Sequence, residues 1–529
     1  MAFFGLYPNT VTYLREYMES IISPLVVQER LLKRILDDNK DTIYGQTHNF
    51  SSIKTIEDFQ KQVPVVQYLD IKNYIDKTAK EGRQNVLTKE EIIFFATSSG
   101  TTSEPKYIPI TKERLKILKK EVLLWSKQIL KKEYRDMAKG KTLYFAAAGH
   151  LGYTKSGIPH GNITGFHVKH LPKYLKRKMV IPAEMYNIND VEKRSKAIAE
   201  KALLERNITQ LAFAAPIEIM LFFDYIKQHK KNLLKTVEKK NPKRAKELRS
   251  LEDFIPKDIW PNIKLISCIK ADINNLYIEE LYNKIGKKIP TRDPGIYASE
   301  GRINLGITDY DNAGVLVANT NFFEFREQLS NGNFDQPVTI DKLEKNKKYN
   351  VLLTTIEGLY RYDVGDIVEV VDFRRKLPIV KYADRNNYIN IVGENMSEIE
   401  LIKAIEQSIQ KTKIELRSYT AAPHIPSGKE KPRYEILIEP KNGLTKEKAI
   451  EFLKMVENTL QKNVLTYKKA RNEFGRIDYP SVCIMAKGTY DKLDKERISK
   501  RGQAKPLIVS KDPHFRERFK FKEVYFYKN

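Results

Sequence analysis

The sequence is poor in cysteine, and no apolar run in it is long enough to cross a membrane. Only Cys268 and Cys483 occur among 529 residues; they lie far apart in apolar, strand-like stretches, which excludes a disulfide framework and predicts buried thiols in a reducing compartment. No window approaches the ~18 apolar residues of a membrane span, and the N-terminus lacks the basic segment of a signal peptide. We therefore expect a soluble, cytoplasmic protein.

Negative charge is scarce relative to positive charge. Lys and Arg total 93 against 67 Asp and Glu, so the formal net charge is +26. Such an excess fits a nucleic-acid or anionic-membrane partner, but the basic residues are spread along the whole chain without zinc-finger spacing or an RNP motif. The densest basic run, residues 227–249, contains Glu238 and Glu247 and resembles an exposed helix pair. We favour a solvated surface that attracts small anionic substrates, with no nucleic-acid partner.

Helical and strand-like segments alternate, which predicts an α/β architecture. Helical periodicity over residues 10–38 is interrupted by Pro24, so we expect two helices there. Thr111 is placed to cap a further helix. The chain shows no internal repeat and no low-complexity tract. Strand-like runs recur at residues 142–148, 210–214, 263–268, 314–318, 349–354 and 367–371.

A second organisation begins near Asp384. Strand-like runs at residues 414–422 and 434–439 precede a helix that Thr445 can cap, and a strand at residues 481–486 follows. We therefore predict a large N-terminal domain of mixed sheets flanked by helices over residues 1–384. A smaller α+β C-terminal domain would occupy residues 385–529.

The segment from Ile92 to Ile110 has the features of a polyphosphate-binding loop. A short apolar run, predicted to be a buried strand, leads into TSSGTTS, seven small and mostly hydroxylated residues, and Lys106 follows Pro105. Backbone N–H groups, hydroxyls and one ammonium are the donors that a polyphosphate requires. The segment is not a Walker A loop, which would read GxxxxGK[ST] and lead into a helix. Taken alone, it is equally compatible with a Ser/Thr-rich surface turn.

Three later stretches carry residue types that could complete a nucleotide site. In residues 295–301, the Tyr297 ring precedes small residues and Glu300, which suits a base lying flat beside a Mg²⁺ ligand. Asp366 begins a strand after a glycine and could accept hydrogen bonds from two ribose hydroxyls. Lys505 could be brought to a reacting carboxylate by a mobile domain. Taken singly, these are equally a Gly-flanked turn, a β-turn Asp and a solvated Lys.

Together these stretches resemble the auxin-responsive Gretchen Hagen family of acyl-acid amido synthetases, a branch of the adenylate-forming enzymes, in a bacterial-type sequence pattern. Each motif alone is weakly specific, but the set occurs in the family's order over nearly the whole chain. The matching stretches are TSSGTTSEPKYIP (97–109), SGIPHGNITG (156–165), YASEG (297–301), NTNFFEF (319–325), GLYRYDVGDIVEV (358–370), ADRNNYINIVGE (383–394) and KGTYDKL with GQAKP (487–506).

The resemblance implies a reaction in two steps. ATP converts a carboxylic acid to an acyl-adenylate, and an amine, typically an amino acid in this family, then displaces AMP to form an amide. The small domain would rotate on a hinge near Asp384 and Arg385 and exclude water from the acyl-adenylate. The implied cofactors are ATP and Mg²⁺, and the partners are a small-molecule acid and an amine. The oligomeric state is left open.

The resemblance also implies site residues by position. Lys505 and Glu300 are the implied catalytic residues; Lys505 would stabilise charge developing between the carboxylate and the α-phosphorus. Glu300 would also hold Mg²⁺. The implied nucleotide-binding residues are Ser98, Ser99, Thr101, Thr102 and Lys106 at the phosphates, Tyr297 and Ser299 at the adenine and α-phosphate, Asp366 at the ribose, and Arg385 beside the hinge.

The chain departs from the family pattern at two points. Many relatives read Tyr-Ala-Ser-Ser-Glu where this chain has YASE at residues 297–300, so one hydroxyl is missing or the register shifts by one. The basic residue that usually follows the last proline motif is also absent, because Leu507 follows Pro506.

Alternative interpretations concern the histidines and the acyl acceptor. His160, His167 and His170, with Asp190 downstream, have spacings that would fit a transition-metal site. The proposed reaction needs no such metal, and we interpret the stretch around His160 as lining the acyl pocket. The competing functions are transfer of the acyl group to a thiol such as coenzyme A, and a basic binding protein that has the fold without the chemistry.

Overall fold

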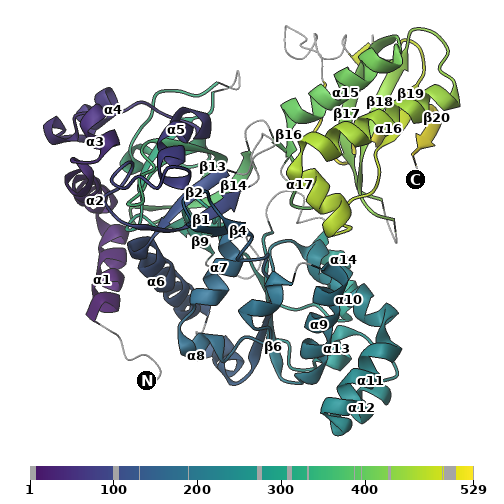
Figure 1. The fold of residues 1–529 in the computed structure, drawn as a ribbon, viewed down its shortest axis with the longest axis horizontal. Coiled ribbons are helices and arrows are strands. Elements are labelled where there is room, and N and C mark those ends of the chain that lie inside the picture. The colour runs from purple at the N-terminus through teal and green to yellow at the C-terminus, as the bar shows by residue number, and fades with distance from the viewer. Residues whose placement is uncertain are drawn as a thin grey trace. The chain divides into compact units, whose positions relative to one another are not determined.

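The computed structural model describes residues 8–98, 106–129, 132–188, 190–270, 277–306, 312–329, 333–385, 388–394, 396–426, 430–490, 492–493 and 508–527. They form two compact units, and the chain passes from the large unit to the small unit between residues 386 and 387 (Figure 1).

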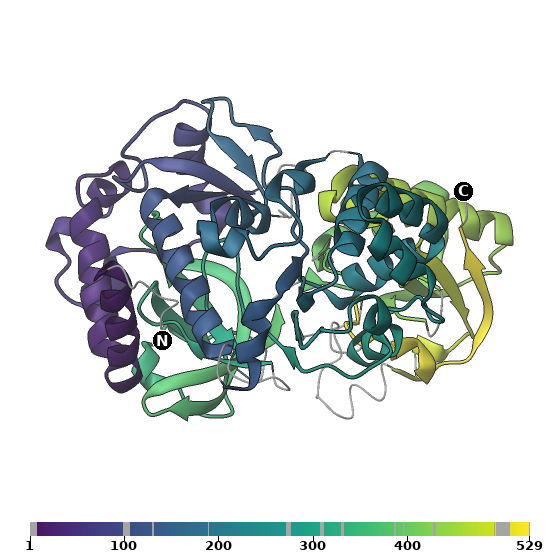
Figure 2. The same cartoon turned by 90° about the horizontal axis from the view of Figure 1, so that it is seen from below.

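Two helices separated by Ser23 open the large unit, as the interrupted periodicity predicted. They are α1 (Pro8–Ile22) and α2 (Pro24–Asn39), and Pro24 occupies the first turn of α2, where its missing N–H costs nothing. Helix α1 packs against α2 and against α6 (Lys112–Ile129) (Figure 2). The short helices α3 (Ile43–Thr47), α4 (Ile56–Gln62) and α5 (Tyr68–Ala79) follow α2.

A four-stranded sheet carries the predicted phosphate-binding segment. Its strands, in the order β2-β1-β5-β4, are β1 (Ile92–Ser98), β2 (Lys106–Thr111), β4 (Gly152–Tyr153) and β5 (Pro159–Gly161). Helix α6 follows β2 directly, and the predicted cap is confirmed because Thr111 Oγ1 accepts a hydrogen bond from the Arg114 N–H (3.2 Å). Helix α7 (Ile163–His170) packs on β1 through stacked Phe94 and Phe166 rings, whose centroids are 4.1 Å apart.

A six-stranded antiparallel sheet packs into the same apolar core as α1, α2 and the first sheet. Strand β13 alternates buried with more exposed residues at its start, as expected where one face covers a core. In spatial order the strands are β11 (Phe322–Glu327), β12 (Lys348–Thr354), β13 (Tyr362–Arg374), β14 (Leu377–Arg385), β10 (Ala313–Leu316) and β9 (Asn304–Gly306).

The remainder of the large unit is a parallel sheet surrounded by helices (teal in Figure 1). Strands β6 and β7 are buried at every residue, as expected for parallel strands covered on both faces. The strand order is β3 (Lys141–Tyr144), β6 (Ile208–Ala212), β7 (Leu265–Ser267) and β8 (Thr291–Arg292). The helices are α8 (Lys173–Lys176), α9 (Val191–Leu204), α10 (Pro216–Gln228), α11 (Lys230–Lys240), α12 (Pro242–Arg249), α13 (Pro256–Ile259) and α14 (Ile278–Ile285).

The small unit is the predicted α+β arrangement. Helices α15 (Glu398–Thr412) and α16 (Lys446–Asn463) lie side by side on one face of its sheet (Figure 1). The Thr445 cap is confirmed by a hydrogen bond from the Lys448 N–H to Thr445 Oγ1 (3.4 Å). The sheet contains β17 (Leu416–His424), β18 (Arg433–Pro440), β19 (Ser481–Met485) and β20 (Phe521–Phe526), in that order; β15 (Tyr388–Ile389), β16 (Met396–Ser397) and α17 (Leu465–Lys468) complete the unit.

The structure also bears on the predicted strands, the two cysteines and the absence of a membrane-spanning helix. All predicted strands are present, but the run at 142–148 is a strand only to Tyr144, because the Ala147 N–H donates instead to Thr164 Oγ1 (3.2 Å). Cys268 and Cys483 are free and buried, as predicted. No helix in the described part of the chain is long and apolar enough to span a membrane.

Candidate functional site

The two strands around the hydroxyl-rich loop are paired as far as Ser98 and Lys106, which lie opposite each other in the antiparallel register of β1 and β2. The Lys106 ammonium lies 5.6 Å from the centroid of the Tyr68 ring. The Tyr107 N–H donates to Tyr68 Oη (2.9 Å), so α5 fixes the start of β2. The expected phosphate ligands Ser99, Thr101 and Thr102 lie outside the described residues.

Tyr297, Ser299 and Glu300 lie together in a tight turn. Ala298 and Gly301 exchange both of their backbone N–H···O hydrogen bonds, at 3.0 and 3.2 Å. A Cβ at position 301 would lie 2.6 Å from Asn321 Nδ2, so a larger residue there would displace the Asn321 side chain. Tyr297 and Ser299 remain partly exposed, whereas Glu300 retains only 6% of its accessible surface. The turn therefore holds a buried glutamate close to a partly exposed tyrosine.

The Tyr297 side chain is restrained at its tip and across its ring. Its Oη shares a hydrogen bond with His167 Nε2 on α7 (2.9 Å). The Arg302 guanidinium carbon lies 4.7 Å from the ring centroid. Burial lowers the pKa of His167 to about 3, assisted by the positive charges of Arg114 and Arg302. The imidazole is therefore neutral at physiological pH.

The three histidines considered for a metal site have separate neighbours. His167 contacts Tyr297, whereas His170 Nδ1–H donates to the Phe166 carbonyl of its own helix (2.8 Å). The His160 ring packs edge-on against Tyr107, with centroids 5.3 Å apart. Asp190 was the fourth residue of the hypothetical metal site. It caps α9 by accepting a hydrogen bond from the Lys193 N–H (2.9 Å). No cluster of three or more potential metal-ligating His, Cys, Asp or Glu side chains occurs within the described ranges.

The predicted ribose ligand Asp366 lies near the start of β13 and is 5% exposed. Its backbone partner across the ladder is Arg385, the last residue of β14. The preceding Gly365 has φ +79°, and its N–H donates to Asp363 Oδ1 (2.8 Å). Asp363 also accepts from Arg326 Nη2 (2.6 Å). Asp363 is thus engaged in holding the start of the strand.

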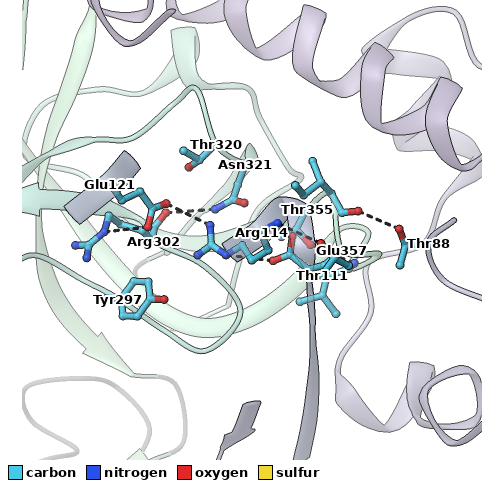
Figure 3. Close-up of polar contacts among 12 residues, drawn as sticks. Thr88, Thr111, Arg114, Glu121, Tyr297, Arg302, Thr320, Asn321, Thr355 and Glu357 are labelled. Carbon is cyan, nitrogen blue, oxygen red and sulfur yellow. Dashed lines mark hydrogen bonds and ion pairs between the residues drawn. The ribbon is translucent and has the colours of Figure 1, made fainter. Parts of the chain in front are cut away.

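A buried ionic network that no sequence motif predicted adjoins Tyr297. Arg114 Nη1 lies 3.2 Å from Glu121 Oε1, and its Nε lies 3.5 Å from Glu357 Oε1. Arg302 Nε lies 3.4 Å from Glu121 Oε2. Figure 3 shows Arg114 between the two glutamates, with Arg302 on the other side of Glu121. The only sequence signal was that Arg114 and Glu121 share the helix face of the buried Leu118.

Glu357 gives this network a dependence on pH. Burial raises the pKa of its carboxyl to about 7, although the Arg114 guanidinium opposes the shift. The folded state therefore binds this proton more tightly than the unfolded chain, in which the group titrates near 4.5. We expect wild-type stability to fall relative to Glu357→Gln as the pH rises from about 4.5 to about 7, by at most about 1.4 kcal/mol per pH unit.

This prediction can be tested by urea unfolding of both proteins between about pH 5 and pH 8. Tryptophan fluorescence reports the large unit selectively, because Trp125 and Trp260 are the only tryptophans and both lie there. Glu238→Gln is the control: its hydrogen bond with Arg249 lowers the pKa of Glu238, so that carboxyl titrates below this range. Parallel stability curves for wild type and Glu357→Gln up to about pH 7 would contradict the prediction.

In the small unit, Glu439 fixes the segment that precedes Lys505. Its two carboxylate oxygens accept from the N–H groups of Gly488 (2.7 Å) and Tyr490 (2.8 Å). Tyr490 Oη donates to the Leu437 carbonyl (3.0 Å) and is itself buried. Gly488 and Tyr490 of the stretch KGTYDKL are thereby tied to β18. Lys505 itself lies outside the described residues.

Comparison with protein families gives three consecutive matches. The GH3 family N-terminal domain matches residues 14–291, the GH3 family central domain matches residues 314–385, and the GH3 family C-terminal domain matches residues 399–514.

Three curated relatives are similar along most of their length. Indole-3-acetic acid-amido synthetase GH3.2 of Arabidopsis thaliana is 25% identical over 437 residues, covering 73% of this chain and 78% of the relative. Jasmonoyl–L-amino acid synthetase JAR4 of Nicotiana attenuata is 23% identical over 514 residues, covering 88% and 87%. The 4-substituted benzoates-glutamate ligase GH3.12 of Arabidopsis thaliana is 23% identical over 519 residues, covering 88% and 89%.

Two solved structures share the fold. AtGH3.15 acyl acid amido synthetase in complex with 2,4-DB superposes with a TM-score of 0.65 at 20% identity, covering 100% of this chain and 99% of the other. A 2-hydroxyisobutyryl-CoA ligase superposes with a TM-score of 0.53 at 13% identity, covering 94% and 91%. The predicted fold, a mixed α/β adenylate-forming architecture, is confirmed.

Proposed function

Because this chain belongs to the GH3 family, we propose that it uses ATP to activate a carboxylic acid and then joins the acyl group to the amine of an amino acid. The observation that carries the proposal is the match to all three family domains in order along the chain. The relatives also support it, since two of them are named for joining an acid to an amino acid or to glutamate.

The proposed chemistry has two displacement steps. A carboxylate oxygen of the acid attacks the α-phosphorus of ATP, and the bond to pyrophosphate breaks, which gives the acyl-adenylate. The amine nitrogen then attacks the acyl carbon; a C–N bond forms, the C–O bond to AMP breaks, and the amine loses a proton. Positioning and electrostatic stabilisation supply most of the catalysis in such phosphoryl chemistry.

We assign the nucleotide-binding roles as the resemblance implied them. The hydroxyls of Ser98, Ser99, Thr101 and Thr102, with Lys106, bind the phosphates, and Ser299 binds near the α-phosphate. Tyr297 lies against the adenine, and its partial exposure is compatible with that contact. Asp366 binds the ribose, beside Arg385. Lys505 approaches the reacting carboxylate when the small unit rotates on a hinge near Arg385, which also excludes water.

Glu300 fits a Mg²⁺ ligand by its chemistry and its setting. It is a carboxylate, the oxygen ligand that Mg²⁺ prefers, and the paired backbone of Ala298 and Gly301 holds its turn. Proteins bind Mg²⁺ through one or two carboxylates together with substrate phosphates. The ion bound there would neutralise charge on the phosphate oxygens.

The function is tested by trapping the acyl-adenylate with hydroxylamine. Aryl, indole and fatty acids are incubated with the protein, ATP, Mg²⁺ and hydroxylamine, and the acyl hydroxamate and pyrophosphate are measured. We expect acid-dependent formation of both products with at least one acid. Amino acids and coenzyme A are then supplied separately with that acid, and we expect an amide and no thioester.

Two results would contradict the proposal in different ways. A thioester without an amide would make the protein an acyl-coenzyme A ligase. No acid-dependent pyrophosphate across the whole panel would favour the basic binding protein without chemistry. Heat-inactivated protein is the control for hydroxamate formed without catalysis.

A further inference from the structure

Arg302 is fixed on three sides next to Tyr297. Its guanidinium carbon lies 4.7 Å from the Tyr297 ring centroid, and its Nη1 donates to the Pro294 carbonyl (3.0 Å). Its Nε lies 3.4 Å from Glu121 Oε2, which comes from helix α6. A planar guanidinium that is held beside an aromatic ring by a hydrogen bond and an ion pair restrains that ring more than a flexible ammonium would.

Glu121, which pairs with Arg302, is itself held by a second ion pair. Glu121 also contacts Arg114, and Arg114 reaches Glu357. The side chains of Arg114, Glu121 and Glu357 are at most 1% exposed, and that of Arg302 is 11% exposed. Buried ion pairs of this kind are often no more stabilising than apolar side chains of the same volume. Their presence beside Tyr297 is therefore better explained by the geometry that they impose.

The Tyr297 ring is consequently restrained at both its tip and its face. His167 on α7 holds its Oη, and Arg302 lies against the ring. Tyr297 is partly exposed, whereas Arg302 is buried behind it. A partly exposed tyrosine backed by a fixed cation is a preorganised surface for a flat ligand, because binding does not have to immobilise the ring.

We propose that Arg302 is a positioning residue that sets the orientation of the Tyr297 ring for the adenine of ATP, with Glu121 as its anchor. This inference rests on the proposed function, because it takes from it the placement of adenine at Tyr297. Arg302 acts through Tyr297 and does not itself touch the nucleotide. Its loss should therefore weaken nucleotide binding without changing the affinity for the acid.

The test measures MgATP affinity by calorimetry in the absence of any acid. We expect Arg302→Met to weaken binding by about tenfold, which corresponds to about 1.4 kcal/mol. Glu121→Gln should weaken it in the same direction by a smaller factor, because the neutral amide still reaches Arg302. Arg302→Lys keeps the charge without the planar group, so we expect an intermediate affinity. These last two variants keep the test decisive if Arg302→Met does not fold.

A double-mutant cycle separates positioning from folding. In the Tyr297→Leu background, Arg302→Met should cause no further loss of MgATP affinity, because the ring that it positions is gone. Arg471→Met in the small unit is the matched control: Arg471 lies 3.6 Å from the Tyr479 ring centroid, and its Nε lies 3.6 Å from Glu457 Oε1. We expect it to lower the melting temperature without changing MgATP affinity.

The outcomes distinguish this inference from the function on which it rests. Equal MgATP affinities for wild type and Arg302→Met, or additive losses in the Tyr297→Leu cycle, would overturn the positioning role alone. A variant with unchanged MgATP affinity and a raised KM for the acid would place Arg302 at the acyl pocket and would also overturn it. No MgATP binding by the wild type would overturn both proposals. Normal MgATP binding without turnover on any acid would contradict only the proposed reaction.

Discussion

Replacing Arg361 with methionine is expected to destabilise the large unit by about 3–5 kcal/mol, the usual cost of removing one partner from a buried ion pair. Arg361 is 4% exposed and pairs with Glu324 through both Nε (2.9 Å) and Nη2 (2.9 Å). Its Nη1 donates to the carbonyls of Gln60 (2.8 Å) and Val63 (2.7 Å). One side chain therefore joins β11, the C-terminal end of α4 and the start of β13.

The cost arises from the groups that the substitution leaves behind. Among the described residues, the Glu324 carboxylate would keep only the hydrogen bond from Gln60 Nε2 (2.9 Å), and the Val63 carbonyl would lose its donor from Arg361. Arg361 has φ +46°, and methionine would carry the same backbone strain. The difference between the two proteins therefore reports the lost contacts. Urea unfolding followed by tryptophan fluorescence measures it in the large unit.

Arg249→Met is the matched control for burial. Arg249 forms the same two-point pairing with Glu238, at 2.6 and 2.6 Å, but both side chains are exposed at the surface of the α11–α12 hairpin. Solvent screens such a pair, so we expect its urea midpoint to match that of wild type. Equal midpoints for Arg361→Met and Arg249→Met would contradict the prediction.

Replacing Lys505 with alanine is expected to slow acid-dependent pyrophosphate release by about 100- to 1,000-fold, the usual effect of removing one preorganised electrostatic contact. In the proposed mechanism its ammonium stabilises charge that develops between the carboxylate and the α-phosphorus. That charge is largest in the transition state, so kcat should fall while MgATP affinity changes little. Pyrophosphate release and calorimetric MgATP binding measure the two effects.

Lys522→Ala on β20 controls for the loss of one positive charge from the small unit. Lys522 is exposed, and we expect its substitution to leave pyrophosphate release unchanged. A rate for Lys505→Ala close to that of Lys522→Ala would remove Lys505 from the mechanism. A rate loss with an equal loss of MgATP affinity would assign Lys505 to nucleotide binding.

Elements governed by local chemistry could be predicted from the sequence. Pro24 separates two helices because a proline cannot donate to the preceding turn. Thr111 and Thr445 cap helices because their hydroxyls reach N–H groups three residues ahead. The strand that precedes the hydroxyl-rich loop followed in the same way from an apolar run.

Contacts between distant segments could not be predicted in this way. The motif GLYRYDVGD predicted a role for Asp366. It did not predict that Arg361 pairs with Glu324, because these two residues are 37 positions apart and meet only in the folded core. His167 and His170 were grouped by their spacing, yet only His167 reaches Tyr297, 130 residues away. The partners of such side chains are set by which faces meet in the core, which spacing alone does not determine.

Helix α6 connects strand β2 to the Tyr297 turn, and the number of residues in the helix sets the direction in which Glu121 points. It begins directly after β2, and Glu121 lies two turns beyond Arg114, on the same face. Inserting or deleting one residue between Thr111 and Glu121 would rotate Glu121 by about 100° around the helix axis and carry it away from Arg302. The number of residues between Thr111 and Glu121 is therefore constrained, even though the exposed positions of the helix tolerate substitution.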